Sequence, residues 1–224
     1  MYHRVASDGP DGLVRWRVPP ADFARQMAWL AEAGYSTVRL DAWEEAARSG
    51  PDALRRRVCL TFDDAYADFV SAAMPVLSRH GFGATMFVPT GFMGGAADWD
   101  LDFGPAAPLM SWADLDGLYR AGIEIGAHTI SHPRLTRIAD DAALAGEIAG
   151  SRDVLKRRYG PVPTFAYPYG DYDARVEKAV AAAGFREAVT IAPQDAGPLG
   201  RGRIGIFGDE PFEAFVAKVT AASA

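Results

Sequence analysis

Helical and strand patterns alternate along the chain. Four amphipathic stretches end at a glycine, and each is followed within a few residues by an apolar strand pattern; the triplets at these ends are Ala33-Gly34-Tyr35, His80-Gly81-Phe82, Ala121-Gly122-Ile123 and Ala183-Gly184-Phe185. Because glycine suits the left-handed cap that ends a helix, each triplet marks a turn from helix to strand. The pattern predicts helices near residues 20–33, 65–80, 111–121, 140–159, 173–183 and 210–222, and strands near residues 36–40, 58–63, 84–89, 123–128, 163–167, 186–191 and 203–207. Such alternation indicates an α/β fold built on a parallel sheet.

Two polar strings stand where predicted strands end. Thr61-Phe62-Asp63-Asp64-Ala65-Tyr66 follows the apolar run Val58-Cys59-Leu60, and His128-Thr129-Ile130-Ser131-His132-Pro133 follows the strand pattern at residues 123–127. In parallel α/β folds, the edge where strands end and loops begin is where chemistry is done. We therefore expect two carboxylates and two imidazoles to emerge at this edge.

The residue types indicate an open metal site. Two imidazoles and one carboxylate leave coordination positions for water and substrate, whereas a structural zinc site is normally closed with thiolates. His128 and His132 are four residues apart, as on a helix face, but Pro133 biases His132 away from the α region and favours a loop. Of the adjacent Asp63 and Asp64, one can bind a divalent ion, zinc before cobalt or nickel, while the other accepts a proton from water.

The composition is that of one enzyme-sized domain. With 224 residues, 49% of them hydrophobic, the chain can bury a full core, and we treat residues 1–224 as a single catalytic domain. The net charge of −6 argues against a nucleic-acid partner, because nucleic-acid binding depends on basic surface. The single cysteine, Cys59, excludes an intrachain disulfide. The sequence lacks an apolar run of roughly 20 residues and a secretory signal pattern, so we expect no transmembrane segment and a cytoplasmic location.

The polar strings resemble the first two motifs of the polysaccharide deacetylases, carbohydrate esterase family four. Phe165-Ala166-Tyr167-Pro168-Tyr169-Gly170 resembles a variant of the third motif, and the order and spacing fit across most of the chain. The resemblance implies an irregular seven-stranded (β/α) barrel. It also implies site roles, which are Asp63 as general base, Asp64, His128 and His132 as metal ligands, and the backbone N–H of Tyr66 as a group that stabilises the oxyanion.

Two residues that the family usually supplies are missing, and the resemblance suggests replacements. The third motif usually begins with an arginine that orients the base, where this chain has Ala166; Arg203 resembles a late arginine of members with the FAYPYG variant, and we predict that it contacts Asp63. The usual C-terminal acid histidine is also missing. Tyr2-His3-Arg4-Val5 resembles the N-terminal Tyr-His segment of the branch that deacetylates poly-N-acetylglucosamine, which makes His3 the candidate general acid. This role requires the segment to form a strand that enters the barrel, and we expect a neighbouring carboxylate to raise the pKa of His3.

The segment between Thr90 and Met110 breaks the alternation of helices and strands. It is rich in Gly, Ala, Pro and Asp, and it lies at the same strand-end edge as the polar strings, so we interpret it as a binding loop. Sugar rings present apolar faces that stack on aromatic side chains. Trp99 of this loop is therefore predicted to form a substrate platform with Tyr167 and Tyr169 of the third motif.

These observations predict metal-dependent hydrolysis of an N-acetyl amide on an amino-sugar glycan or oligosaccharide, with release of acetate. The partner is then a carbohydrate that bears N-acyl groups. One alternative is a cytoplasmic amidase or deformylase that acts on a small-molecule or lipid-linked amide, which Ala166 and the missing signal pattern keep open. Another is a carbohydrate-binding protein that has lost catalysis, against which the intact set of Asp63, Asp64, His128 and His132 argues.

Overall fold

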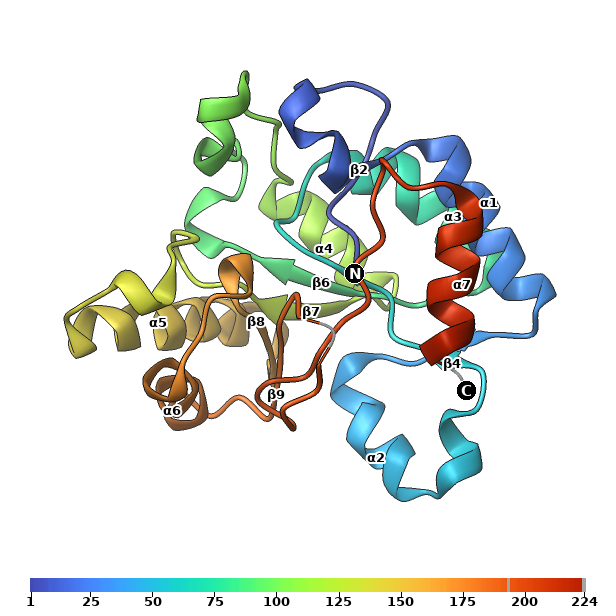
Figure 1. Ribbon diagram of the computed structural model, residues 1–224. Helices are drawn as coiled ribbons and strands as arrows, with labels where there is room; N and C mark the ends of the chain where they lie inside the picture. Colours follow the sequence, from blue (N-terminus) through green and yellow to red (C-terminus); the bar gives the residue numbers. More distant parts are fainter. Residues whose placement is uncertain (193, 223–224) are drawn as a thin grey trace.

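A parallel sheet of five strands forms the centre of the molecule (Figure 1). The computed structural model describes residues 1–192 and 194–222. The strands are β5 (Thr61–Phe62), β6 (Thr85–Val88), β7 (Glu124–Ala127), β8 (Thr164–Ala166) and β9 (Glu187–Val189). They pair in chain order, β5-β6-β7-β8-β9, and every pair is parallel. The carboxyl ends of all five strands therefore meet at one edge.

Six longer helices surround the sheet, close to the positions that the sequence predicts. They are α1 (Pro20–Glu32), α3 (Met74–His80), α4 (Trp112–Arg120), α5 (Asp141–Tyr159), α6 (Ala174–Ala182) and α7 (Phe212–Ala222). Helices α1, α3 and α7 lie together on one side of the molecule and α5 and α6 on the other (Figure 1). Within the part of the chain that the structure describes, none of the helices is both long and apolar enough to cross a membrane.

Shorter helical elements fill the connections. They are η1 (Asp11–Trp16), η2 (Leu40–Ala42), α2 (Trp43–Arg48), η3 (Pro51–Leu54), η4 (Phe69–Ala73), η5 (Thr90–Phe92), η6 (Asp98–Phe103), η7 (Leu135–Arg137) and η8 (Pro168–Gly170). The predicted helix at residues 65–80 starts later than expected, since residues 65–67 lie outside it, and η4 winds as a π-helix before α3. Pro75 has no N–H to donate into a preceding α-helical turn, which accounts for the break.

The helix ends follow signals in the sequence. Gly81 ends α3 with φ 65°, in the left-handed region where glycine carries no Cβ penalty. At the start of α4, the Ser111 side chain accepts a hydrogen bond from the Asp114 N–H, and the Asp114 carboxylate accepts one from the Ser111 N–H. At the starts of α5 and α6, the side chains of Asp140 and Asp173 each accept a hydrogen bond from the backbone N–H three residues further on. Gly81 therefore sets the end of α3, and the three side-chain caps set the starts of α4, α5 and α6.

The predicted α/β fold is confirmed, but the sheet has five strands instead of seven. Strand β3 (Ser36–Thr37) pairs only with β4 (Arg57–Val58), in a separate two-stranded sheet. Strand β1 (Arg4–Val5) likewise pairs with β2 (Arg17–Val18). Residues 203–207 lie outside the strands, because Gly202 and Gly205 weaken regular pairing there.

Two extended segments continue the backbone hydrogen bonding around the open edges of the sheet. Tyr2 pairs with the β5 edge, where its N–H donates to Thr61 O at 2.8 Å and its carbonyl accepts from the Asp63 N–H at 3.0 Å. Residues 201–206 bond to residues 188–192 beyond β9 and also to Met1. The first and the last extended segments are thus neighbours, and the first lies next to β5, which the aspartate pair follows.

Aromatic packing ties the N-terminal segment to the sheet. The Tyr2 ring stacks on Phe62 with centroids 5.3 Å apart, and Phe23 meets it edge-on at the same distance. The Tyr2 hydroxyl donates to Gln26 of α1 at 2.9 Å. Burying each Phe side chain contributes about 1.5–3 kcal/mol. The segment at residues 2–5 is therefore held in place, as the predicted role of His3 requires.

Candidate metal centre and active site

The two polar strings meet at the carboxyl edge of the sheet, as predicted. Asp63 and Asp64 directly follow β5, and His128 directly follows β7. The backbone here is left-handed at four non-glycine residues, with φ between 57° and 74°, which are Asp64, Ala65, Thr129 and His132. Each such conformation costs of order 1–3 kcal/mol and persists only where the surroundings enforce it. One such contact is the His132 N–H, which donates to the Thr129 hydroxyl at 2.9 Å.

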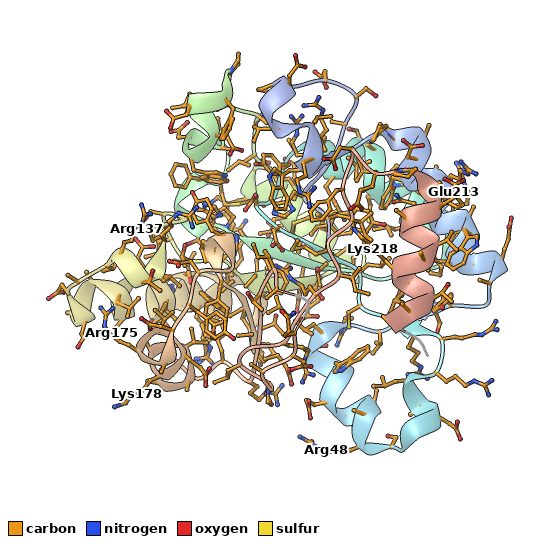
Figure 2. The ribbon with its side chains drawn as sticks, in the orientation of Figure 1. Arg48, Arg137, Arg175, Lys178, Glu213 and Lys218 are labelled. Carbon is orange, nitrogen blue, oxygen red and sulfur yellow. The ribbon has the colours of Figure 1, made fainter. Side chains whose placement is uncertain are left out.

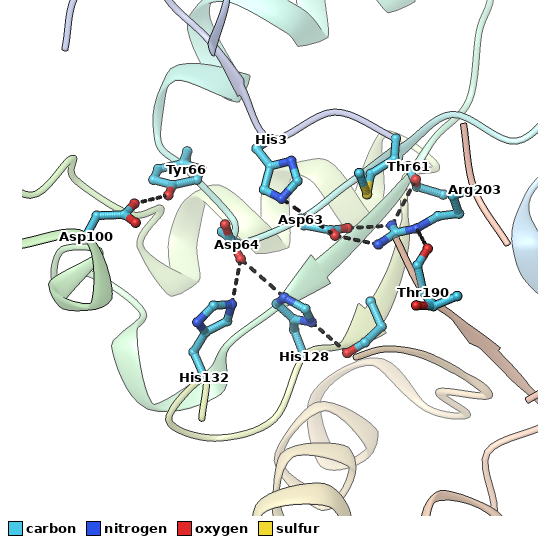
Figure 3. Close-up of polar contacts among 12 residues, drawn as sticks. His3, Thr61, Asp63, Asp64, Tyr66, Asp100, His128, His132, Thr190 and Arg203 are labelled. Carbon is cyan, nitrogen blue, oxygen red and sulfur yellow. Dashed lines mark hydrogen bonds and ion pairs between the residues drawn. The ribbon is translucent and has the colours of Figure 1, made fainter. Parts of the chain in front are cut away.

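Asp64, His128 and His132 bring three ligand atoms to one point (Figure 3). The Nε2 atoms of both histidines lie 3.2 Å from Asp64 Oδ1. All three side chains are buried. Tetrahedral zinc with bonds of 2.0–2.1 Å spaces its ligand atoms by about 3.3 Å. The observed spacing therefore fits a divalent ion of that size.

The hydrogen bonding of the triad also fits a cation. His128 Nδ1 lies 2.7 Å from the carbonyl oxygen of Ala166, so Nδ1 carries the proton and the Nε2 lone pair is free. Burial lowers the pKa of His132, although Asp64 partly offsets it, which favours a neutral ring. Among the described residues, the buried Asp64 Oδ1 has no hydrogen-bond donor. A buried anionic oxygen that faces two nitrogen lone pairs is costly unless a cation lies between them.

Arg203 holds Asp63 through the predicted contact. Its Nη1 donates to Asp63 Oδ1 at 2.7 Å and its Nη2 to Oδ2 at 2.6 Å. Its Nε also donates to Thr190 O at 3.0 Å, and its Nη1 to Thr61 Oγ1 at 3.1 Å. Burial alone would raise the pKa of Asp63, but the charge and hydrogen bonds of Arg203 outweigh it and hold that pKa below the usual carboxyl range. Asp63 is therefore ionised and fixed in orientation at neutral pH.

His3 lies next to Asp63, in the position that the sequence analysis requires (Figure 3). Its Nε2 is 4.0 Å from Asp63 Oδ2, and the Trp16 ring packs against its imidazole with centroids 4.7 Å apart. The expected direction of its pKa is wrong. Burial lowers the pKa of His3 more than the nearby Asp64 and Asp63 raise it. The physical reason is first the burial of the imidazole, which disfavours its charged form, and then the positive charge of Arg203 beside Asp63.

Tyr66 follows the left-handed turn and lines the same cavity as the triad. Its hydroxyl donates to Asp100 Oδ2 at 2.8 Å, and burial raises its pKa well above the ordinary value, so the phenol stays protonated. Within the chain that the structure describes, its backbone N–H has no hydrogen-bond acceptor. Such an N–H can stabilise negative charge that develops on a nearby oxygen.

The metal triad, Asp63, His3 and Tyr66 all line one cavity of about 330 Å³. Trp99 and Tyr169 form part of its wall. Trp99 stacks on His132 with centroids 4.2 Å apart, and Tyr169 contacts the same imidazole at 4.7 Å. Two of the three aromatic residues predicted for a substrate platform are thus placed beside the triad.

Tyr167, the third predicted platform residue, is not brought to the cavity. It is fully buried, its hydroxyl donates to Leu199 O at 2.7 Å, and its ring stacks on Tyr172. Side chains two positions apart on a strand share a face, and Tyr167 continues the face of Phe165, which packs into the core. Tyr169 escapes this alternation because its backbone is left-handed, with φ 59°.

Several residues of the cavity wall were not predicted from the sequence, among them Trp16, Asp100 and Arg134. Trp16 belongs to η1, and nothing in the sequence indicates that this turn folds back over His3. Asp100 lies within the segment interpreted as a binding loop, and its place in that segment is the sequence feature that could have identified it. Arg134 directly follows Pro133 of the second polar string, and this position next to the predicted ligands is the feature that could have identified it.

The family model for polysaccharide deacetylases matches residues 51–188. The putative polysaccharide deacetylase YxkH of Bacillus subtilis (strain 168) is 27% identical over 194 residues, which cover 86% of this chain and 63% of that protein. The poly-beta-1,6-N-acetyl-D-glucosamine N-deacetylase of Escherichia coli (strain K12) is 31% identical over 134 residues, covering 57% of this chain and 20% of that protein. The matches thus span less than two thirds of either relative. Among solved structures, the Streptococcus pyogenes deacetylase PplD, in complex with acetate, superposes with a TM-score of 0.81 at 25% identity, covering 97% of this chain and 95% of that one.

Proposed function

Because this chain belongs to the polysaccharide deacetylase family, we propose that it hydrolyses the N-acetyl amide of an amino sugar in a glycan or oligosaccharide and releases acetate. The observation that carries the proposal is the meeting of two units in one cavity. One unit is the Asp64, His128 and His132 triad, and the other is the Asp63 carboxylate held by Arg203. The names of the relatives, a polysaccharide deacetylase and an N-deacetylase, support the same reaction.

Asp64, His128 and His132 would hold one divalent ion, zinc before cobalt or nickel. Their one oxygen and two nitrogen donors suit these metals and leave positions open for water and substrate. When bound, the ion would supply Lewis acidity that polarises the acyl carbonyl and lowers the pKa of water toward about 7.

Asp63 acts as the general base in this proposal. Its ionised carboxylate accepts the proton of the water that attacks the acyl carbon. Arg203 restricts that carboxylate to one orientation, through two hydrogen bonds of 2.7 and 2.6 Å. The backbone N–H of Tyr66 donates to the acyl oxygen as negative charge develops on it.

His3 acts as the general acid that protonates the departing amine. Without that proton the leaving group would be an amide anion, and the reaction would return to substrate. The imidazole Nε2 lies 4.0 Å from Asp63 Oδ2, so the proton that Asp63 accepts is a short step from His3. This path matters because burial lowers the pKa of His3, which makes the charged imidazole scarce before the attack.

We also assign the chain to the branch with an N-terminal Tyr-His segment and a FAYPYG third motif. His3 in the cavity and Arg203 on Asp63 are the two observations that support this assignment. Trp99 and Tyr169 would bind the sugar, since both flank His132 on the cavity wall. The E. coli relative is named for poly-β-1,6-N-acetyl-D-glucosamine, which makes β-linked N-acetylglucosamine oligomers the first substrates to test.

Acetate release from N-acetylglucosamine oligomers, by zinc-loaded and by chelated protein, tests the function. We expect turnover that chelation abolishes and zinc restores. Asp63→Asn should keep the metal and lose turnover by about 10²- to 10⁴-fold, while Asp64→Asn should weaken metal binding itself. If the two variants behave alike in both assays, the division of roles is wrong. Hydrolysis of small amides without glycans would favour the amidase alternative, and glycan binding without turnover would favour a binding protein.

A further inference from the structure

Arg134 places an unpaired positive charge on the wall of the active-site cavity. It is exposed, and it lines the same cavity as Asp64, His128 and His132. Its guanidinium lies over the Tyr169 ring, 4.1 Å from the centroid. Across the residues that the structure describes, no protein oxygen accepts a hydrogen bond from this guanidinium.

The other arginines near the cavity already have carboxylate partners. Arg4 pairs with Asp68 at 2.7 Å, and Asp63 is held by Arg203. Arg134 is therefore the cavity arginine whose five N–H donors remain for a ligand.

Tyr169 presents this guanidinium close to the metal triad. The tyrosine backbone adopts φ 59°, a left-handed conformation that is uncommon outside glycine and that turns its ring toward His132. Two successive contacts, of 4.7 Å from His132 to Tyr169 and 4.1 Å from Tyr169 to Arg134, link the triad to the guanidinium. The guanidinium is therefore one aromatic ring away from His132. An arginine stacked on a ring face keeps the donors along its own edge free.

Resting on the deacetylase function proposed above, we propose that Arg134 binds an oxyanion, a carboxylate or a phosphate, carried by the sugar that is deacetylated or by its neighbour. A planar guanidinium matches either oxyanion with two parallel hydrogen bonds. The preferred substrate would accordingly be an anionic N-acetylated glycan in place of a neutral one.

Binding of three matched monosaccharides to the zinc-loaded protein tests this inference by calorimetry. N-acetylglucosamine is the neutral probe, N-acetylmuramic acid adds a carboxylate, and N-acetylglucosamine 6-phosphate adds a phosphate. We expect at least one anionic probe to bind about three- to tenfold more tightly than the neutral one, the range of an exposed but well-oriented charge pair. The anion with the greater preference identifies which of the two chemistries the site accepts.

Three variants separate a specific contact from general electrostatics. Arg134→Gln keeps a planar head group over Tyr169 without the charge and should abolish the preference, whereas Arg134→Lys should retain part of it. Arg137→Gln is the matched control, because Arg137 is exposed and lies away from the cavity lining at the edge of the molecule (Figure 2). It should leave the preference intact, and all three variants should keep the wild-type melting temperature.

Several results would overturn the inference. Equal affinity of the wild type for all three probes would do so, as would a preference that survives Arg134→Gln or is lost equally in Arg137→Gln. Because binding is measured without turnover, the outcome does not depend on acetate release. A failure of the deacetylase assay with an intact anion preference would therefore count against the proposed reaction alone.

Discussion

Replacing Arg203 by methionine tests whether its buried pair with Asp63 supports both stability and catalysis. The guanidinium makes four hydrogen bonds, two of them to Asp63. The two side chains are only 6% and 3% exposed. Arg203→Met leaves the Asp63 charge buried and unpaired, which costs about 3–5 kcal/mol. For a domain of this length, that corresponds to a fall in melting temperature of roughly 6–20 °C.

The loss of stability in Arg203→Met should depend on pH. In the wild type, burial raises the pKa of Asp63 but the Arg203 charge and hydrogen bonds outweigh it, so the pKa is lowered. Its contribution to stability is then present above the ordinary carboxyl pKa and is lost as the pH falls through the lowered value. In the variant the Arg203 contributions are gone, and burial then outweighs the weaker effects of His3 and His128, so we expect a raised pKa and a stability that falls as the pH rises. The unfolding free energies of the two proteins should therefore converge in acid and separate toward neutral pH.

Urea unfolding of the chelated proteins measures the stability term, and acetate release by the zinc-loaded proteins measures the catalytic one. We expect Arg203→Met to lower kcat by about 10²- to 10⁴-fold, as when a general base is lost. Combining it with Asp63→Asn removes the buried charge, so the double variant should be more stable than Arg203→Met alone. Arg201→Met is the matched control, since Arg201 lies on the same segment but pairs with Glu187 outside the cavity lining. A double variant no more stable than Arg203→Met, or an equal loss of turnover in Arg201→Met, would refute the reasoning.

The remaining predictions concern the metal, the acid and a buried carboxyl. His128→Ala together with His132→Ala should abolish stoichiometric zinc binding, measured by elemental analysis of reconstituted protein, and binding that survives would contradict the triad. His3→Ala should slow amide hydrolysis by about a hundredfold or more while barely changing hydrolysis of an activated ester, whose leaving group needs no proton; equal losses on both substrates would show that His3 is a bystander. Burial raises the pKa of Glu124, so the fold should lose stability as the pH rises from the ordinary carboxyl range through the raised value. Glu124→Gln should flatten this dependence in urea unfolding, and an unchanged pH profile would assign it to other groups.

Local signals were sufficient to predict the six longer helices, apart from the start of α3, but not the short helix α2. Glycine at helix ends and Ser or Asp at helix starts act over a few residues, so Gly81 and Ser111 mark the boundaries of α3 and α4 directly. The predicted number of strands was wrong because the pairing of strands depends on residues far apart in the sequence. The predicted strands at residues 36–40 and 203–207 have the apolar pattern, yet each requires a neighbour whose position the sequence does not specify.

The contacts of the site also divide into those that local sequence signals predict and those that join distant parts of the chain. The triad could be predicted because each ligand directly follows, or lies just beyond, a strand of one parallel sheet. The pairing of Arg203 with Asp63, 140 positions apart, came only from the resemblance to a family. Tyr167 was misplaced because the left-handed turn at Tyr169, which separates the two rings, leaves no mark in the sequence.

Ala166 and Arg203 are linked through the packing between them. Ala166 is fully buried in a cluster with Phe87, and the Arg203 guanidinium lies 5.6 Å from the centroid of the same ring. Because interiors are close-packed, a long side chain at position 166 would compete with Phe87 for space. The cation that orients Asp63 is instead Arg203, from the segment at residues 201–206. The position of that segment depends on its backbone contacts with Met1. Those contacts also adjoin the segment that carries His3, so loosening them should displace the orienting cation and the proposed acid together while the metal triad stays in place.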